Sequence, residues 1–476
     1  MLKLFLKFSF GSWISAVISF FTVPIITLLI NPEQFGKSAM FMLAYGILTQ
    51  IVLFGTDQSF VRFFYEYEEK KRPALLWNAI LPSIIVWFFV SIGLACCWKW
   101  ISTWLISEEQ MLIVGILSIN LLIGLFNRYA VLVIRMQKKG ILFSSLQIIT
   151  SVINAAVIIV YSKFVENTFY AIIWGGLCSL LITTLFSVIK ERNFWFVRLS
   201  ISRTQTKTIL LYGLPFLPAC LMSMFFEGMD KIFIREFVGF EGLGLYNVAF
   251  KVVAVLSILR DGFSMFWTPT SYEHYEKSPD DKTLYEKAFK YLSFILVICG
   301  LGLIAAKDVI VLLFSKNYAD TASIMPFLIF IPIMYILSEV TYLGINFMKK
   351  TYWHIVIFGL LLLLCPLLNY IFVPLFGVKG AAIAVALSYT CYFILRTLIS
   401  VRLYPVNFCL GKTLLSMLLL FFVAGINTFV ANKIIGIGSA AIIALIYALF
   451  HLATIKEMVV YFRNMLTGKK LDTVNE

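Results

Sequence analysis

The stretch FSFGSWISAVISFFTVPIITLLI, residues 8–30, decides the fold class of this chain. It contains no charged residue, and a helix that spans a membrane needs about 20 consecutive, mostly apolar residues. The run is too long for the apolar part of a signal peptide, and no small-residue cleavage site follows it. We therefore expect a retained membrane helix.

Similar segments recur from end to end of the chain. Of its 476 residues, 61% are hydrophobic and 13% are charged, and the mean hydropathy is +0.92. This composition excludes a soluble protein and predicts an all-α integral membrane protein. The expected spans number about fourteen: 8–30, 36–58, 77–98, 110–133, 141–162, 168–189, 209–234, 243–268, 287–306, 321–346, 352–373, 379–401, 411–431 and 434–454.

The distribution of Lys and Arg predicts the orientation of these spans. If the amino terminus is cytoplasmic, 27 of the 39 basic residues fall at or beside inner joins and tails, and 8 fall at outer joins. The positive-inside rule then places both termini in the cytoplasm. Anionic lipid at the inner face accounts for most of the net charge of +14, so no nucleic-acid partner is expected.

Residues that carry chemistry are scattered in this sequence. The eight cysteines lie in or beside apolar segments without metal-ligand spacing, and His274, His354 and His451 occur singly. No phosphate-binding loop, zinc motif or nucleophile elbow occurs. The longest polar join, 269–286, is too short to be a catalytic domain. We expect a transporter without cofactor or metal, and not an enzyme.

An internal repeat organises the spans, because four landmarks recur in order at offsets of 202 to 211 positions. The landmark pairs are Gly11 and Gly213, Glu33 and Glu241, Asp57 and Asp261, and Lys138 and Lys349. The repeating unit is six helices, and since six is even, both copies run the same way through the membrane.

Parallel repeats of this kind are related by a pseudo-two-fold axis along the membrane normal, and transporters bind substrate between the two halves. The sequence predicts a six-helix lobe at 1–203 and a second at 204–405. Two further helices and a cytoplasmic tail occupy 406–476. The basic join 189–208 separates the lobes.

Lys251 is predicted to be the most deeply placed charge, about 12 Å along its helix at 1.5 Å per residue. A lysine at that depth needs a watery cavity, an acidic partner or an anionic ligand. We favour ligand contact. The alternative is a structural salt bridge to Glu227 or Asp230. These two acids lie with Lys231 near the outer end of the preceding helix, where the three charges could be ordinary surface residues or could form an outer gate.

A second group of charges is predicted near the cytoplasmic ends of helices. Each side chain could also reach the lipid headgroups without a specific role. Asp57 and Asp261 occupy matching places in the two lobes, so we expect two symmetry-related acids at the inner mouth of the cavity. The group comprises Asp57, Arg62, Arg128, Arg260, Asp261 and Glu339.

Three stretches carry a family resemblance: FGTDQSFVRFFYE at 54–66, YGLPFLPACLMSMFFEGMDKIFI at 212–234 and PLFGVKGAAIAVALSY at 374–389. They resemble the polysaccharide-exporter branch of the multidrug/oligosaccharidyl-lipid/polysaccharide flippase superfamily, which comprises the O-antigen and capsule repeat-unit flippases. The resemblance spans the whole chain.

This resemblance implies a V-shaped pair of bundles that alternates between inward- and outward-open states in the bacterial cytoplasmic membrane. The implied activity is the movement of an undecaprenyl-diphosphate-linked oligosaccharide to the outer leaflet for cell-surface polysaccharide biosynthesis. A proton or cation gradient and a polysaccharide polymerase are the implied partners besides membrane lipids. The implied substrate-binding residues are Lys251, Arg260, Arg128 and Arg62, and the implied coupling residues are Asp57, Asp261 and Glu339.

Three other functions remain open on the sequence. A drug/cation antiporter of the same superfamily would favour acidic residues in its cavity. A lipid II flippase would share the fold. A membrane glycosyltransferase or polymerase would usually carry a sizeable extramembrane domain, whereas every join here is short.

Overall fold

The chain is all-helical in the computed structural model. The model describes the backbone of residues 2–197 and 200–467, and their side chains apart from 2–9, 257–262, 265, 266 and 461–467. Within these residues every regular element is a helix and none is a strand. Helices satisfy their backbone hydrogen bonds internally, as a chain in hydrocarbon must. The predicted fold class, an all-α membrane protein, is confirmed.

Contacts divide the chain into two compact units. Unit 1 comprises residues 1–258, 314–318 and 358–381, and unit 2 comprises 259–313, 319–357 and 382–476. The predicted lobes, 1–203 and 204–405 followed by 406–476, were defined by the repeat rather than by contacts, and they stay a prediction.

Unit 1 contains the first twelve α-helices and most of a later one. Its elements are α1 (Leu2–Leu29), α2 (Pro32–Leu53), α3 (Thr56–Phe63), η1 (Glu69–Lys71), α4 (Arg72–Cys96), α5 (Trp98–Ile106), α6 (Met111–Met136), α7 (Gly140–Phe164), α8 (Phe169–Lys190), α9 (Arg192–Trp195), α10 (Arg203–Gly213), α11 (Phe216–Phe237), α12 (Phe240–Val253), η2 (Ala254–Leu256), η3 (Lys316–Tyr318) and most of α18 (Tyr352–Phe376).

Unit 2 is built around α14, which packs on α15, α16, α20 and α21. Its elements are α13 (Ser257–Lys277), α14 (Thr283–Val311), α15 (Thr321–Leu328), α16 (Phe330–Thr341), α17 (Leu343–Phe347), most of α19 (Val378–Leu403), α20 (Leu410–Phe429), α21 (Lys433–Phe450) and α22 (Leu452–Thr467).

Twelve helical segments in the described part of the chain are long and apolar enough to cross a membrane. A thirteenth is obtained if α10 and α11, which meet at 43°, form one broken span. The sequence predicted about fourteen. The remaining expected span, 243–268, is divided by η2 between α12 and α13, and several of its side chains lie outside the described residues.

The turn after α2 positions Asp57, which the sequence singled out. Asn31 caps the start of α2 by accepting a hydrogen bond from the Gln34 amide at 2.9 Å, and Pro32 follows at the first helical position. The helix ends where Phe54 and Gly55 adopt left-handed conformations, with φ of 52° and 73°. The chain then re-enters a helix at α3, so Asp57 lies in the first turn of α3.

Two glycines let α2 and α12 cross unusually closely. A Cβ on Gly36 would lie 1.9 Å from the carbonyl oxygen of Phe240, and a Cβ on Gly244 would lie 1.8 Å from that of Pro32. Phe240 and Gly244 each follow their counterparts, Pro32 and Gly36, by 208 positions. A pair of reciprocal contacts related by the repeat offset is what a two-fold axis between the two helices produces.

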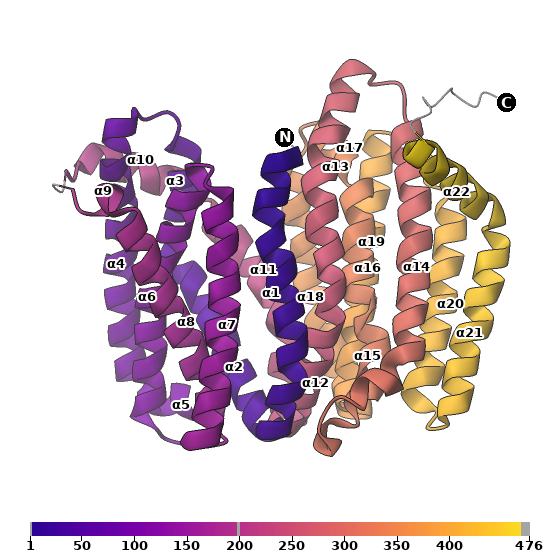
Figure 1. Cartoon of the computed structure of the whole chain (residues 1–476), viewed down its shortest axis with the longest axis horizontal. Helices are drawn as coiled ribbons and strands as arrows, with labels where there is room; N and C mark the ends of the chain where they lie inside the picture. Colours follow the sequence, from indigo (N-terminus) through magenta and orange to yellow (C-terminus); the bar gives the residue numbers. More distant parts are fainter. Residues whose placement is uncertain (1, 198–199, 468–476) are drawn as a thin grey trace. The chain divides into compact units, whose positions relative to one another are not determined.

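Helix α1 packs along α7, and α7 packs on α8 (Figure 1). At one end of the α1–α7 contact, the Gly11 amide donates to the Ser144 hydroxyl at 3.1 Å, and the Ser12 hydroxyl donates to the Gln147 side chain at 3.0 Å. A Cβ on Gly11 would lie 2.4 Å from the Ser144 Cα. The two helices are therefore fixed to each other along a face that continues into the cavity described next.

Candidate functional site

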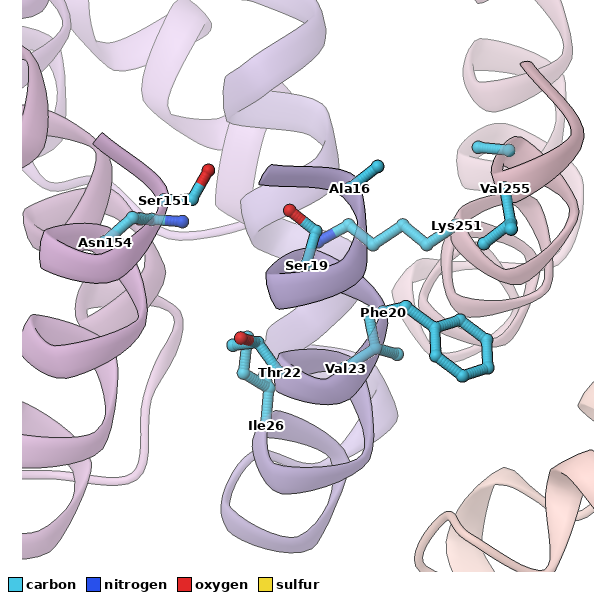
Figure 2. A pocket seen from close by; sticks show the side chains of 11 residues that line it. Ala16, Ser19, Phe20, Thr22, Val23, Ile26, Ser151, Asn154, Lys251 and Val255 are labelled. Carbon is cyan, nitrogen blue, oxygen red and sulfur yellow. The ribbon is translucent and has the colours of Figure 1, made fainter. Parts of the chain in front are cut away.

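Lys251 projects from the last turn of α12 into a cavity of about 360 Å³ in unit 1. Figure 2 shows its side chain extending across α1 toward Ser19. Helices α1 and α7 and the segment formed by α12 and η2 build the walls. The lining residues are Ala16, Ser19, Phe20, Thr22, Val23, Ile26, Ser151, Asn154, Lys251, Ala254 and Val255.

The Lys251 ammonium has no carboxylate within ion-pair distance in the described part of the chain. Its Nζ lies 4.7 Å from the centroid of the Phe35 ring, in a cation–π contact. Such a contact contributes about 0.5–2 kcal/mol and leaves the donor capacity of the ammonium unused. Lys251 lines a cavity, and both its depth in the membrane and its role stay predictions.

The two acids considered as structural partners for Lys251 make other contacts. Asp230 is buried and accepts a hydrogen bond from the Tyr246 hydroxyl. Glu227 accepts from the Ser223 hydroxyl at 3.4 Å. Neither forms an ion pair with Lys251 among the described side chains, so the salt-bridge alternative is not what the structure shows.

Among the described residues that line the cavity, the polar groups are neutral apart from Lys251, and none is an acid. The Thr22 hydroxyl donates to the Ile18 carbonyl at 2.6 Å, and the Ser151 hydroxyl donates to the Gln147 carbonyl at 3.1 Å. One ammonium with hydroxyl and amide groups suits an anionic, hydroxyl-rich ligand, whereas a cationic ligand would meet an uncompensated like charge.

Asp57 and Arg128, 71 positions apart, form an ion pair between α3 and α6. Asp57 Oδ2 accepts hydrogen bonds from Arg128 Nη2 at 2.7 Å and Nε at 3.1 Å. The Asp57 side chain is 7% exposed, whereas that of Arg128 is 44% exposed. The pair therefore anchors the carboxylate and leaves part of the guanidinium accessible.

A buried network next to this pair holds α3, α4 and α6 together. The Thr56 hydroxyl lies 2.7 Å from the Tyr129 hydroxyl and 2.8 Å from the Ser83 hydroxyl. Tyr129 also donates to the Ala79 carbonyl at 3.1 Å. These contacts fix the residues that precede Asp57 and follow Arg128, so the geometry of the ion pair is set by the fold.

Arg62 and Glu66 form an ion pair one helical turn apart, and both side chains are about half exposed. Of the charges predicted near the inner ends of helices, Asp57 and Arg128 are paired in unit 1, and the grouping as a whole stays a prediction. Arg260 and Asp261 lie in α13, and their side chains are outside the described residues.

The charges predicted as an outer gate belong to α11. Besides the contacts of Glu227 and Asp230 given above, Lys231 lies with its ammonium 5.4 Å from the Phe250 ring centroid. Asp230 Oδ1 has no hydrogen-bond partner among the described groups. The gate role of these residues stays a prediction.

In unit 2 Glu339 meets Arg396, a residue that the sequence pattern did not single out. Arg396 is 6% exposed, its Nη1 lies 3.6 Å from Glu339 Oε1, and it donates to the Ser338 hydroxyl at 2.7 Å. The rings of Tyr342 and Tyr392 lie over the guanidinium at 4.1 and 4.8 Å. Its position inside the apolar run 379–401 was the available signal.

No group of three or more His, Cys, Asp or Glu side chains is placed to hold a metal ion within the described residues. The described residues that line the cavity likewise include none of these types.

A family model described as "Polysaccharide biosynthesis protein" matches residues 25–323. An uncharacterized membrane protein of Haemophilus influenzae is 22% identical over an alignment of 260 positions that covers 52% of this chain and 59% of that protein. The match thus spans less than two thirds of that relative's length.

Two solved structures of similar fold are a flippase and a multidrug transporter. The lipid II flippase MurJ in an inward closed conformation matches with a TM-score of 0.67 and 17% identity, covering 94% of this chain and 99% of that one. A multidrug resistance MATE family transporter in an inward-facing conformation matches with a TM-score of 0.59 and 13% identity, covering 87% and 98%.

These likenesses show that the chain shares the fold of MurJ and of the MATE transporters. The family model covers more than half of the chain. The chain belongs to the polysaccharide biosynthesis protein family of membrane proteins.

Proposed function

We propose that this protein is a flippase that moves an undecaprenyl-diphosphate-linked oligosaccharide across the bacterial cytoplasmic membrane by alternating access. The observation that carries the proposal is Lys251, an ammonium that has no carboxylate partner among the described side chains and lies in a cavity whose other described lining groups are hydroxyl, amide or apolar. Membership of the polysaccharide biosynthesis family and the transporter fold support it.

The chemistry of such a ligand fits the cavity. A diphosphate is anionic, and moving it unassisted through hydrocarbon is prohibitive because a charge loses its hydration. An ammonium held in a watery cavity offsets that loss. Lys251 is the proposed primary phosphate contact. Arg128 is the proposed second one, because its guanidinium remains partly exposed beside Asp57.

The remaining predicted residues have subordinate roles in this proposal. Arg62 is paired on the surface with Glu66, and Arg260 and Asp261 are assigned by the resemblance alone. Coupling to a proton or cation gradient through an acid such as Glu339, cytoplasmic termini and association with a polymerase are likewise part of the proposal.

The test is export of surface polysaccharide in cells that lack the gene. We expect lipid-linked repeat units to accumulate on the inner leaflet and the intact gene to restore export. Lys251→Ala should fail to restore it, and Lys251→Arg should restore part of it. Lys99→Ala is the matched control, because Lys99 is an exposed lysine of unit 1 that pairs with Glu109 at 3.4 Å.

Unchanged polysaccharide export on deletion would refute the proposal, as would full restoration by Lys251→Ala. Two other outcomes would instead support the functions of proteins that share this fold. Drug efflux on overexpression would indicate an antiporter, and accumulation of lipid II with loss of viability would indicate a peptidoglycan role. Sugar transfer by the purified protein from a labelled donor would indicate a transferase.

A further inference from the structure

Asn154 is an unsatisfied polar group in the Lys251 cavity. Its carboxamide lines the cavity from α7, half-buried, and makes no hydrogen bond within the part of the chain whose side chains are described. Ser151 lies three positions earlier, and residues three apart share a helix face. Figure 2 shows the two side chains together on α7, across α1 from the body of Lys251.

The neighbouring helix is shaped to admit this carboxamide. A Cβ on Gly175 of α8 would lie 2.8 Å from Asn154 Oδ1 and 2.7 Å from the Ile158 side chain. Any residue larger than glycine there would push the amide away from its present position. The carboxamide therefore occupies a space that the packing of α7 on α8 leaves for it.

The cavity divides by chemistry into a charged part and a neutral polar part. Lys251 is the cation among the described lining residues, whereas Asn154 offers an amide that can donate and accept hydrogen bonds, and Ser151 offers a hydroxyl oxygen that can accept while its O–H donates to the Gln147 carbonyl. Groups of this kind recognise sugar hydroxyl or acetamido groups. A sugar carboxylate would find no second cation among the described lining residues, and desolvating it there would be costly.

We propose that Asn154, assisted by Ser151, is a specificity-determining residue that recognises an uncharged sugar next to the phosphate bound by Lys251. This inference rests on the proposed function. It names the preferred substrate class as lipid diphosphates whose first sugar is a neutral hexose or an N-acetylated amino sugar, in preference to a uronic acid.

The experiment measures binding to the purified full chain in nanodiscs. Three probes are compared: undecaprenyl diphosphate alone, the same lipid bearing one N-acetylglucosamine, and the same lipid bearing one glucuronic acid. Two new hydrogen bonds to a sugar strengthen binding by about tenfold. We expect the N-acetylglucosamine probe to bind about tenfold more tightly than the bare diphosphate, and the glucuronic acid probe to lack this gain.

Variants separate the two parts of the cavity. Asn154→Ala should abolish the difference between the N-acetylglucosamine probe and the bare diphosphate while leaving the bare diphosphate bound. Gly175→Ala should do the same by displacing the carboxamide. Lys251→Ala should weaken all three probes. The matched control is Thr150→Ala on α7, because the Thr150 hydroxyl donates to the Leu146 carbonyl of its own helix at 2.8 Å.

A ratio of affinities is a readout that a merely structural role of Asn154 would not move. An unchanged ratio in Asn154→Ala would overturn the inference, as would equal binding of the glucuronic acid and N-acetylglucosamine probes. In either case binding of the bare diphosphate would leave the proposed function standing. Failure of the wild-type protein to bind any of the three probes would overturn both.

Discussion

The close crossing of α2 and α12 predicts an unusually damaging glycine-to-alanine change at Gly36. A Cβ there would lie 1.9 Å from the Phe240 carbonyl oxygen, and real Cβ atoms essentially never approach another heavy atom within 3.0 Å. The two helices must therefore separate by at least about 1.1 Å. The neighbour is a backbone atom, which cannot rotate away as a side chain could.

The expected cost follows from that displacement. Overpacking a well-packed site costs about 1–3 kcal/mol, partly offset by the higher helix propensity of alanine, up to about 1 kcal/mol. Gly46→Ala is the matched control on the same helix, because the nearest atom to its Cβ would be Met224 Sδ at 3.9 Å, an ordinary contact. The propensity gain is common to both variants, so their difference isolates the steric cost.

The assay is the free energy of unfolding of the purified protein in mixed detergent micelles. We expect Gly36→Ala to be less stable than Gly46→Ala by about 1–3 kcal/mol. Gly244→Ala should behave like Gly36→Ala, since its Cβ would lie 1.8 Å from the Pro32 carbonyl oxygen. The double variant should lose less than the sum, because one separation of the helices relieves both clashes. Equal stability of Gly36→Ala and Gly46→Ala would refute this reasoning.

Three further predictions concern charges. Asp57→Asn should lower the free energy of unfolding by only about 1–2 kcal/mol, because its arginine partner is partly exposed; chemical denaturation measures this loss. Arg396→Met should cost about 3–5 kcal/mol by the same measurement, because it leaves the Glu339 carboxylate in a buried site without its arginine, and adding Glu339→Gln should recover much of the loss. Asp281 lies in a polar join, where the Thr283 hydroxyl and backbone amide donate hydrogen bonds to its carboxylate. These bonds hold the pKa of the Asp281 carboxyl below its usual 3.8. An acid whose pKa is lowered in the folded state stabilises the fold above its unfolded-state pKa, and this stabilisation is lost as the pH falls through the folded-state pKa. The melting temperature of Asp281→Asn should therefore depend less on pH below about 4 than that of the wild type.

Hydropathy was sufficient to predict the helical membrane fold, because the length and apolar character of a span are properties of contiguous residues. The segments 8–30 and 434–454, for example, correspond to α1 and α21. Boundaries inside a span were less predictable. The expected span 243–268 contains η2 (Ala254–Leu256), and no proline or charged residue within those three positions marks the break in the sequence.

The partners of the charged residues could not be predicted from sequence. Depth along a helix indicated that Lys251 needs a cavity or a partner, and the structure places it in a cavity. Asp57 and Arg128 were both singled out, but their pairing joins positions 71 apart and depends on the turn at Gly55. Asn154 carries no charge, so no cost of burial distinguished it from other polar residues in apolar runs.

At one pair of positions related by the repeat offset, a charge is kept in place but its sign is not. Arg128 and Glu339 are 211 positions apart, the same offset as Lys138 and Lys349, yet one is a base and the other an acid. Each pairs within its own unit, Arg128 with Asp57 and Glu339 with Arg396.

A position can carry either charge if a partner of opposite charge neutralises it, because an unpaired charge in an apolar bundle is costly. A cation without a carboxylate partner is then the residue best placed to bind an anion. Among the predicted substrate-binding residues with described side chains, Arg62 and Arg128 each have a carboxylate partner. Lys251 instead contacts an aromatic ring and lies in a cavity. Loss of transport in Lys251→Ala is therefore a sharper test of the proposed flippase activity than substitution of either arginine.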